Sequence, residues 1–192
     1  MSKTVEDLMY QLSDIFMFPV LVLLLMLFAY SLFVLGALGA EAWQRKSNAD
    51  KFRAIVNRKT SIQEKSSLKG FPLLTLANYH PDICRDELDV AAFKLLEGVR
   101  TVSRLAPMLG LIATMIPMGP ALKSLADGNV QGISENLVVA FSAVIFGLVI
   151  ASITFWVASV RKRWLASELV AVLGFLQLTK PVNREGELNE AA

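Results

Sequence analysis

The residues best suited to chemistry in this chain form a small polar patch inside an apolar stretch, residues 105–122. In a helix, Pro117 cannot donate the backbone hydrogen bond that the carbonyl of Ala113 would otherwise accept. Thr114 adds a hydroxyl at the same level. Free carbonyl groups at membrane depth are tolerated only where they are buried in protein or face water. The patch therefore either lines a hydrated path, or it is a kink at which Thr114 bonds back to Gly110.

A second group of reactive side chains surrounds His80, the only histidine of the chain. The spacing of these side chains matches no strong zinc signature. They are better explained by a turn at Pro81, which ends the short apolar segment Phe71–Tyr79 before a new helix starts at Asp82. No paired carboxylates and no nucleophile with a neighbouring base are visible elsewhere. The sequence therefore predicts neither an enzyme nor a cofactor or metal site. The members of this group are His80, Asp82, Cys84, Asp86 and Glu87.

Three long stretches, residues 15–40, 105–122 and 136–160, contain no Asp, Glu, Lys, Arg or His. Each is close to or above the roughly 20 residues that a helix needs to cross a bilayer. A self-contained ion carrier usually keeps a charged group at membrane depth, although this costs about 2.5–3.5 kcal/mol or more. The chain is therefore either a structural membrane protein, or one part of a machine whose titrating group lies on a partner.

The distribution of cations predicts the orientation of these spans. The chain has 192 residues and a net charge of only +2, yet residues 41–104 carry twelve Lys and Arg, and Arg161, Lys162 and Arg163 follow the third stretch. Residues 1–14 and 123–135 carry one cation each. Cations concentrate on the cytoplasmic side of membrane proteins. We expect a multi-pass membrane protein with its N-terminus outside and its C-terminus in the cytoplasm.

The segments between the spans follow from the same pattern. Residues 1–14 are expected to be an amphipathic helix on the outer surface or a frayed terminus, and residues 41–104 a cytoplasmic helical segment. Residues 123–135 form a short external link with a turn at Asp127-Gly128-Asn129, after which Ser134 is a plausible helix cap. Residues 161–180 continue the third span as a cytoplasmic helix through Leu178, and residues 181–192 are expected to be a disordered tail.

One long helix is predicted to run from Asp82 into the second span, with Gly98 and Pro107 as its only weak points. Its cytoplasmic part carries an apolar stripe that needs neighbours in water. Copies of the same chain are the simplest neighbours, so we expect a homo-oligomer. The stripe comprises Leu88, Ala91, Ala92, Leu95, Leu96, Val99 and Val102.

Small residues recur at helical spacing in the third span. In lipid, small residues allow two helix backbones to approach closely and so mark a packing surface. The stripe could serve packing against the other spans of the same chain, or packing between subunits or around a central partner. Gly110 lies on a similar face of the second span. The stripe comprises Ala140, Ala143, Gly147, Ala151, Thr154 and Ala158.

Two motifs in this order resemble one membrane-protein family. The run Leu109–Thr114 (LGLIAT) resembles the LGLLGT motif of the MotA/TolQ/ExbB proton-channel family. The run Glu135–Leu148 resembles that family's third span, which begins with E-x-L and continues through small residues to Gly-Leu. The predicted topology also looks like that of TolQ and ExbB. The resemblance covers roughly residues 88–164, and the run Ile116–Leu122 departs from it, which indicates a divergent member.

The resemblance implies an all-α membrane protein with three transmembrane helices, two of which extend into the cytoplasm. It implies a pentamer that encloses the single-span helices of a TolR-, ExbD- or MotB-like partner, whose membrane Asp titrates. Thr114, Ala113, Pro117, Val144 and Ser142 would then line the ion path. The residues that pack on the partner helices would be Gly110, Ala140, Ala143, Gly147 and Ala151.

At one position the chain departs from the family's polar lining. Where the family usually has Thr, three residues before the third-span Gly147, this chain has Val144, and the nearest hydroxyl, Ser142, lies off the stripe. The departure counts against sodium coupling, which needs several oxygen ligands. The sequence therefore predicts a proton-channel motor subunit in the lipid bilayer, with no nucleic acid involved. The alternative is a non-conducting scaffold for a single-span partner.

Overall fold

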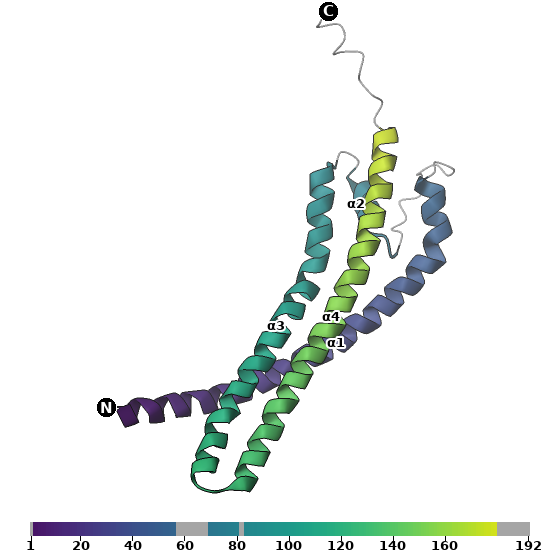
Figure 1. Cartoon of the computed structure of the whole chain (residues 1–192). Helices are drawn as coiled ribbons and strands as arrows, with labels where there is room; N and C mark the ends of the chain where they lie inside the picture. Colours follow the sequence, from purple (N-terminus) through teal and green to yellow (C-terminus); the bar gives the residue numbers. More distant parts are fainter. Residues whose placement is uncertain (1, 57–68, 81–82, 180–192) are drawn as a thin grey trace, which may run out of the picture. The chain divides into compact units, whose positions relative to one another are not determined.

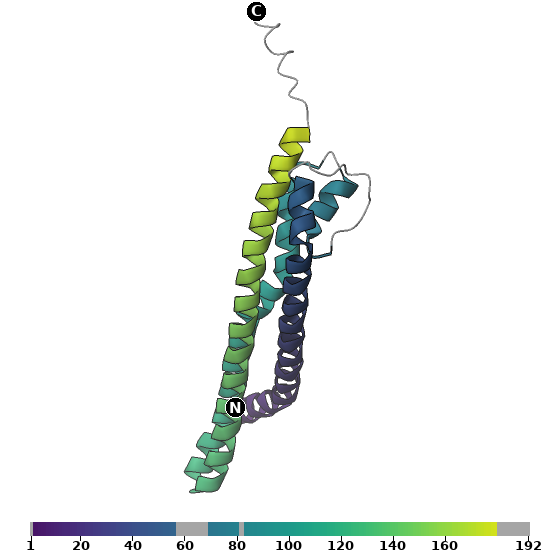
Figure 2. The same cartoon turned by 90° about the vertical axis from the view of Figure 1, so that its right-hand side faces the viewer.

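The chain is an all-helical protein in a computed structural model that describes residues 2–56, 69–80 and 83–179 (Figures 1 and 2). Its helices are α1 (Ser2–Val56), α2 (Pro72–Tyr79), α3 (Arg85–Ala126) and α4 (Val130–Thr179). No strand lies in these described ranges. The predicted all-α class is confirmed, whereas the predicted tail at 181–192 lies outside the described residues.

Three of these helices contain stretches that are long and apolar enough to cross a membrane: Ile15–Ala54, Arg85–Ala126 and Val130–Gly174. They contain the three uncharged stretches of the sequence, one in each helix. The prediction of three helices long and apolar enough to span a membrane is therefore confirmed. Each helix is longer than a span, because no break separates the span from the polar residues beside it.

Helix α3 runs without interruption through Gly98 and Pro107, as predicted. It begins at Arg85; the expected start at Asp82 lies outside the described residues. The Glu87 carboxylate accepts a hydrogen bond from the backbone N–H of Cys84 at 3.2 Å, which is the backbone half of a capping box. Cys84 and Glu87 thus belong to a helix start.

The turn between α3 and α4 is shorter than the predicted link and consists of Asp127, Gly128 and Asn129. Gly128 has a φ of 71°, a conformation that glycine adopts without steric cost. The side-chain oxygen of Asn129 accepts a hydrogen bond from the N–H of Gly132 at 3.1 Å and so caps α4. The expected cap at Ser134 was wrong, because the helix begins one turn earlier and the Ser134 hydroxyl donates to the carbonyl of Val130 inside it.

The chain divides into two compact units. Unit 1 comprises residues 1–37 and 97–159. Its core is made by small and branched side chains that let α1, α3 and α4 pack together, and Phe28 meets Phe146 edge-on at 5.3 Å between ring centroids. The buried core residues are Leu24, Ala106, Ala113, Ala143 and Ile150.

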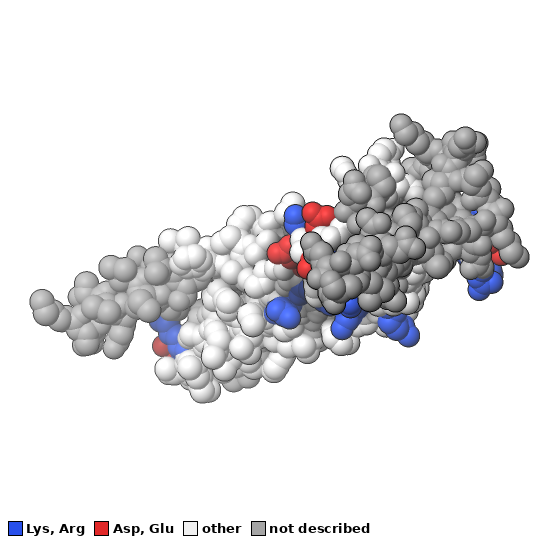
Figure 3. Space-filling view, turned by 90° about the horizontal axis from the view of Figure 1, so that it is seen from above, with Lys and Arg blue, Asp and Glu red and all other residues white. Residues whose placement is uncertain are grey.

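Unit 2 comprises residues 38–96 and 160–192. In its core, Leu88 and Leu96 of α3 pack with α2 and with Leu165 and Val172 of α4. Part of the apolar stripe that suggested an oligomer is therefore covered within the chain itself, while Leu95 stays exposed. In the view of Figure 3, a broad part of the described surface shows neither Lys and Arg (blue) nor Asp and Glu (red).

Candidate functional site

A close backbone contact in unit 1 lies between Gly147 of α4 and Gly110 of α3. A Cβ added to Gly147 would lie 2.8 Å from the carbonyl oxygen of Ala106 and 3.0 Å from the Cα of Gly110. A Cβ added to Gly110 would lie 3.3 Å from the carbonyl oxygen of Ala143 and from the Cα of Gly147. Both residues are glycine because the two backbones touch at this level, as in membrane helix pairs with small residues at the contact.

The rest of the small-residue stripe continues this packing surface along α4. Ala140, Ala143, Thr154 and Ala158 are buried in the single chain, and Ala151 is half-buried. The hydroxyl of Thr154 donates to the carbonyl of Ile150 at 2.7 Å, so it brings no free donor into the core. Of the two alternatives left by the sequence, the structure shows packing within the chain for these buried positions.

Thr114 lies one helical turn beyond Gly110 and is half-buried. Its hydroxyl donates to the carbonyl of Leu111 at 2.6 Å, three residues back, and not to Gly110 as the kink interpretation supposed. A hydroxyl has two lone pairs besides its hydrogen, so the Thr114 oxygen can still accept a hydrogen bond from water or from an acid. Thr114 therefore offers one acceptor at the edge of the packed face.

The carbonyl groups that the prolines leave free differ in their surroundings. Helical carbonyls point along the axis toward the residue four positions on. The carbonyl of Ala113 therefore points toward Pro117, which is buried, and that of Ile116 toward Pro120, which is half-buried. Ala113 and Pro117 thus belong to the packed interior of the chain, where a free carbonyl is tolerated. Only the second carbonyl lies near the margin of that interior.

The two remaining predicted pathway residues lie on different faces of α4. Val144 is half-buried, and its Cα would be 3.5 Å from a Cβ added to Gly110. Ser142 is exposed in the single chain, and its hydroxyl donates to the carbonyl of Val138 at 2.8 Å. Thr114 and Val144 therefore flank the same glycine contact on opposite helices, whereas Ser142 is separate from them.

Taken together, these residues can order water but cannot move a proton on their own. Thr114 supplies a hydroxyl and Ile116 a carbonyl, while Val144 and the glycine contact supply apolar walls. None of them titrates near neutral pH. Any acid or base that takes part in proton transfer along this surface must therefore lie outside this set of residues. Among the described residues, no group of three His, Cys, Asp or Glu side chains could hold a metal ion.

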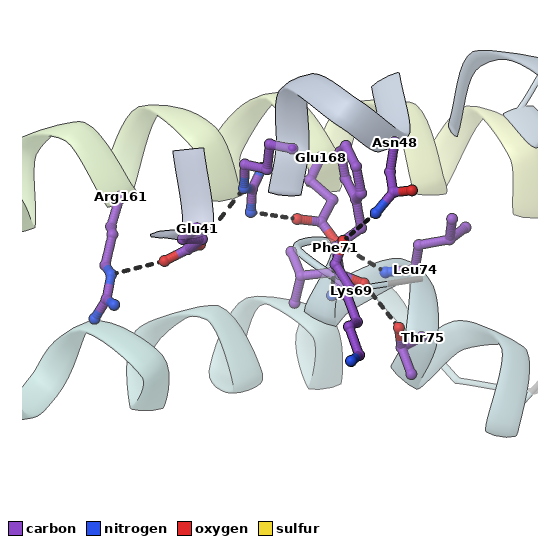
Figure 4. A network of polar contacts seen from close by, with 10 residues as sticks. Glu41, Asn48, Lys69, Phe71, Leu74, Thr75, Arg161 and Glu168 are labelled. Carbon is purple, nitrogen blue, oxygen red and sulfur yellow. Dashed lines mark hydrogen bonds and ion pairs between the residues drawn. The ribbon is translucent and has the colours of Figure 1, made fainter. Parts of the chain in front are cut away.

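Unit 2 holds a set of charged contacts that the sequence analysis missed. The carboxylate of Glu168, buried on α4, accepts hydrogen bonds from the N–H groups of Leu73 and Leu74 at 2.7 and 3.0 Å and from Arg45 at 3.0 Å (Figure 4). Glu41 lies between Arg45 and Arg161, at 3.5 and 3.0 Å. Charged side chains of alternating sign therefore connect α1 with α4 and with the start of α2.

Burial raises the pKa of the Glu168 carboxyl, against the opposing effects of the Leu74 N–H, the Arg45 charge and the Leu73 N–H. This residue lies beyond the predicted third span. One sequence signal could have found it: Glu168 falls three residues after Leu165 and four before Val172, on the apolar stripe of the helix. A carboxylate at that register predicts a buried partner, although not which one.

Comparison with known proteins adds one finding. A family model described as the MotA/TolQ/ExbB proton channel family matches residues 39–172, which include α2, α3 and most of α4. The matched range contains the glycine contact, Thr114 and the charged contacts of unit 2. No curated protein and no solved structure gives a significant match.

Proposed function

Because this chain belongs to the MotA/TolQ/ExbB proton channel family, we propose that it is the channel and motor subunit of an ion-driven complex in a prokaryotic inner membrane. Several copies, five by analogy with the family, would enclose the single-span helices of a partner that carries a membrane Asp. Proton flow through this assembly would drive movement of the partner. At 100 mV, each proton contributes about 2.3 kcal/mol from the potential alone.

The observation that carries this proposal is the lack of any Asp, Glu, Lys, Arg or His in the three apolar stretches of a proton-channel family member. A proton cannot cross hydrocarbon without groups that accept and release it. The chain contributes hydroxyl and carbonyl oxygens at the margin of its packed face, and the partner would contribute the acid. This division of roles explains why the chain avoids the cost of a buried carboxylate in each copy.

Thr114 is the residue to which we assign contact with water or with the partner's carboxyl group. Its hydroxyl already donates to Leu111, so the Thr114 oxygen would act as an acceptor for a protonated acid. Val144 lies across the glycine contact, where the family usually has a second hydroxyl. The pathway therefore relies more on Thr114 than in relatives with both groups.

The test is proton flux into vesicles that carry the complex with its partner. Thr114→Val keeps the side-chain shape and removes the hydroxyl, so assembly should survive and flux should fall by about 10- to 100-fold, as for loss of a buried hydrogen-bond partner. Val144→Thr supplies the usual family residue and should leave flux unchanged or raise it. Equal flux in all three proteins would show that the patch is only a packed kink.

Val144 also favours a second candidate, a non-conducting scaffold that holds a single-span partner on the same fold. A valine where a hydroxyl is usual makes the surface less able to order water. The scaffold predicts complexes that assemble but pass no protons, whether or not Thr114 is changed. The flux measurement on the unaltered complex therefore separates the two functions.

A further inference from the structure

The segment Lys69–Tyr79, which includes α2, is held in unit 2 by a small number of specific contacts. We call this segment the strap. The residue before α2, Phe71, makes no side-chain cap, and the helix starts with Pro72. Glu168 of α4 takes the place of the cap, because its Oε1 atom accepts hydrogen bonds from the backbone N–H groups of both Leu73 and Leu74. The first turn of α2 is thus capped by a side chain that lies 95 positions after Leu73 and 94 positions after Leu74 in the sequence.

The other oxygen of Glu168 binds Arg45 of α1, and Arg45 in turn contacts the strap. Its guanidinium lies 5.0 Å from the ring centroid of Phe71 and 5.1 Å from that of Trp164. Phe71 also stacks on Phe52 of α1 at 4.2 Å, with the rings nearly parallel. Arg45 therefore joins α1, the strap and α4 through one charged group between two aromatic rings.

The beginning of the strap is fitted to the same arginine. Gly70 has a φ of 96°, and a Cβ added to it would lie 3.2 Å from the Cγ of Arg45. The side chain of Asn48 donates to the carbonyl of Lys69 at 3.1 Å. These contacts leave little room for a second arrangement of the strap while Arg45 is in place.

Two features indicate that these contacts do more than fill space. A buried ion pair often stabilises a protein no better than well-packed apolar residues of similar volume, and its best-attested use is to fix one arrangement over others. In addition, Gly70 and Pro72 of the strap form part of the wall of a pocket of about 280 Å³, which Glu41, Arg161 and Leu165 also line. The position of the strap therefore determines the shape of this pocket.

We propose that the strap is a releasable conformational element, which the Glu168 carboxylate holds closed by capping α2 while it pairs with Arg45, and which opens as a unit when these contacts of Glu168 are lost. Opening removes Leu73, Leu74 and Ala77 from the core of unit 2 and uncovers Leu88, Leu165 and Val172 beneath them, since all six belong to one buried cluster. Unit 1 shares no residue with that cluster, so its helices stay folded when the strap opens. The proposal does not depend on proton conduction.

Hydrogen–deuterium exchange of the full-length protein in detergent or nanodiscs tests this proposal. In Glu168→Ala, two buried N–H donors and the Arg45 charge lose their acceptor, so amides of residues 72–79 should exchange about 10- to 100-fold faster. Amides of residues 140–157 in unit 1 should exchange as in the unaltered protein. Ser167→Ala, on the neighbouring exposed position of α4, is the matched control and should change neither region.

Two further variants separate a cap from a simple ion pair. Glu168→Gln keeps an acceptor oxygen for Leu73 and Leu74 but loses the charge, so it should give an intermediate rate. Arg45→Glu combined with Glu168→Arg restores the ion pair. The arginine side chain has no acceptor for the N–H groups of Leu73 and Leu74, so the strap should stay open. Wild-type protection of residues 72–79 in Glu168→Ala or in the exchanged pair would overturn the proposal. Faster exchange throughout unit 1 in Glu168→Ala would overturn it as well, because the strap would then not open separately.

Discussion

Replacing Gly147 by alanine should weaken the packing of unit 1 more than the same change at Gly110 or at Gly36. The new methyl group would meet the carbonyl oxygen of Ala106 at 2.8 Å and the Cα and N of Gly110 at 3.0 and 3.4 Å. All three are backbone atoms of α3, so no side chain can rotate away. The helices must separate by about 0.6 Å to bring the closest of these contacts to 3.4 Å, where ordinary van der Waals contact begins.

The expected cost follows from the overpacking of well-packed interiors, about 1–3 kcal/mol. This corresponds to roughly a 5- to 150-fold loss in the folding equilibrium. Gly110→Ala should cost less, because its nearest contacts would be 3.3 Å. Gly36→Ala in α1 meets nothing within 4 Å and should be neutral or stabilising by up to about 1 kcal/mol, since alanine favours helix.

Thermal unfolding of the purified protein in one detergent, followed by size-exclusion chromatography, measures this series. The order of stability should be Gly36→Ala, then Gly110→Ala, then Gly147→Ala. If Gly147→Ala and Gly36→Ala have the same stability, the glycine contact between α3 and α4 is not formed, and the account of unit 1 is refuted. If Gly147→Ala changes oligomer size alone, the stripe packs between chains.

Three other predictions concern topology, assembly and the turn. With Cys84→Ser as background, a cysteine at Ser47 should not react with an impermeant reagent added outside intact cells, and labelling there would reverse the predicted orientation. Native mass spectrometry of the detergent-solubilised protein should give a homo-oligomer, most simply a pentamer, whereas a monomer would contradict the proposed assembly. Asn129→Ala should lower the free energy of unfolding by about 1 kcal/mol through loss of the cap on Gly132, and an unchanged unfolding temperature would show that the cap contributes nothing.

The helices of unit 1 could be predicted because their signals are local. Long uncharged stretches specify spans, and small residues at helical spacing specify the face of α4 that packs. What this pattern could not show was the partner of that face. Gly147 meets Gly110 of the same chain, and a stripe of small residues fits a neighbour in the same chain as well as one in another chain.

The strap and the charged contacts of unit 2 were not predicted, because they join positions far apart in the sequence. Glu168 and Arg45 are separated by 123 residues, and nothing near either one specifies the other. Glu168 on an apolar stripe was a visible irregularity, but its donors belong to the backbone of α2. Backbone groups carry no residue type, so no sequence pattern identifies them.

The central claim, that this chain forms a proton path only together with a partner's acid, is tested most directly by flux through the reconstituted complex. Vesicles would contain the chain alone, the chain with its single-span partner, or the chain with a partner whose membrane Asp is changed to Asn. The account predicts proton flux in the second preparation and none in the first and third. Flux through the chain alone, or no flux with the unaltered partner, would contradict it.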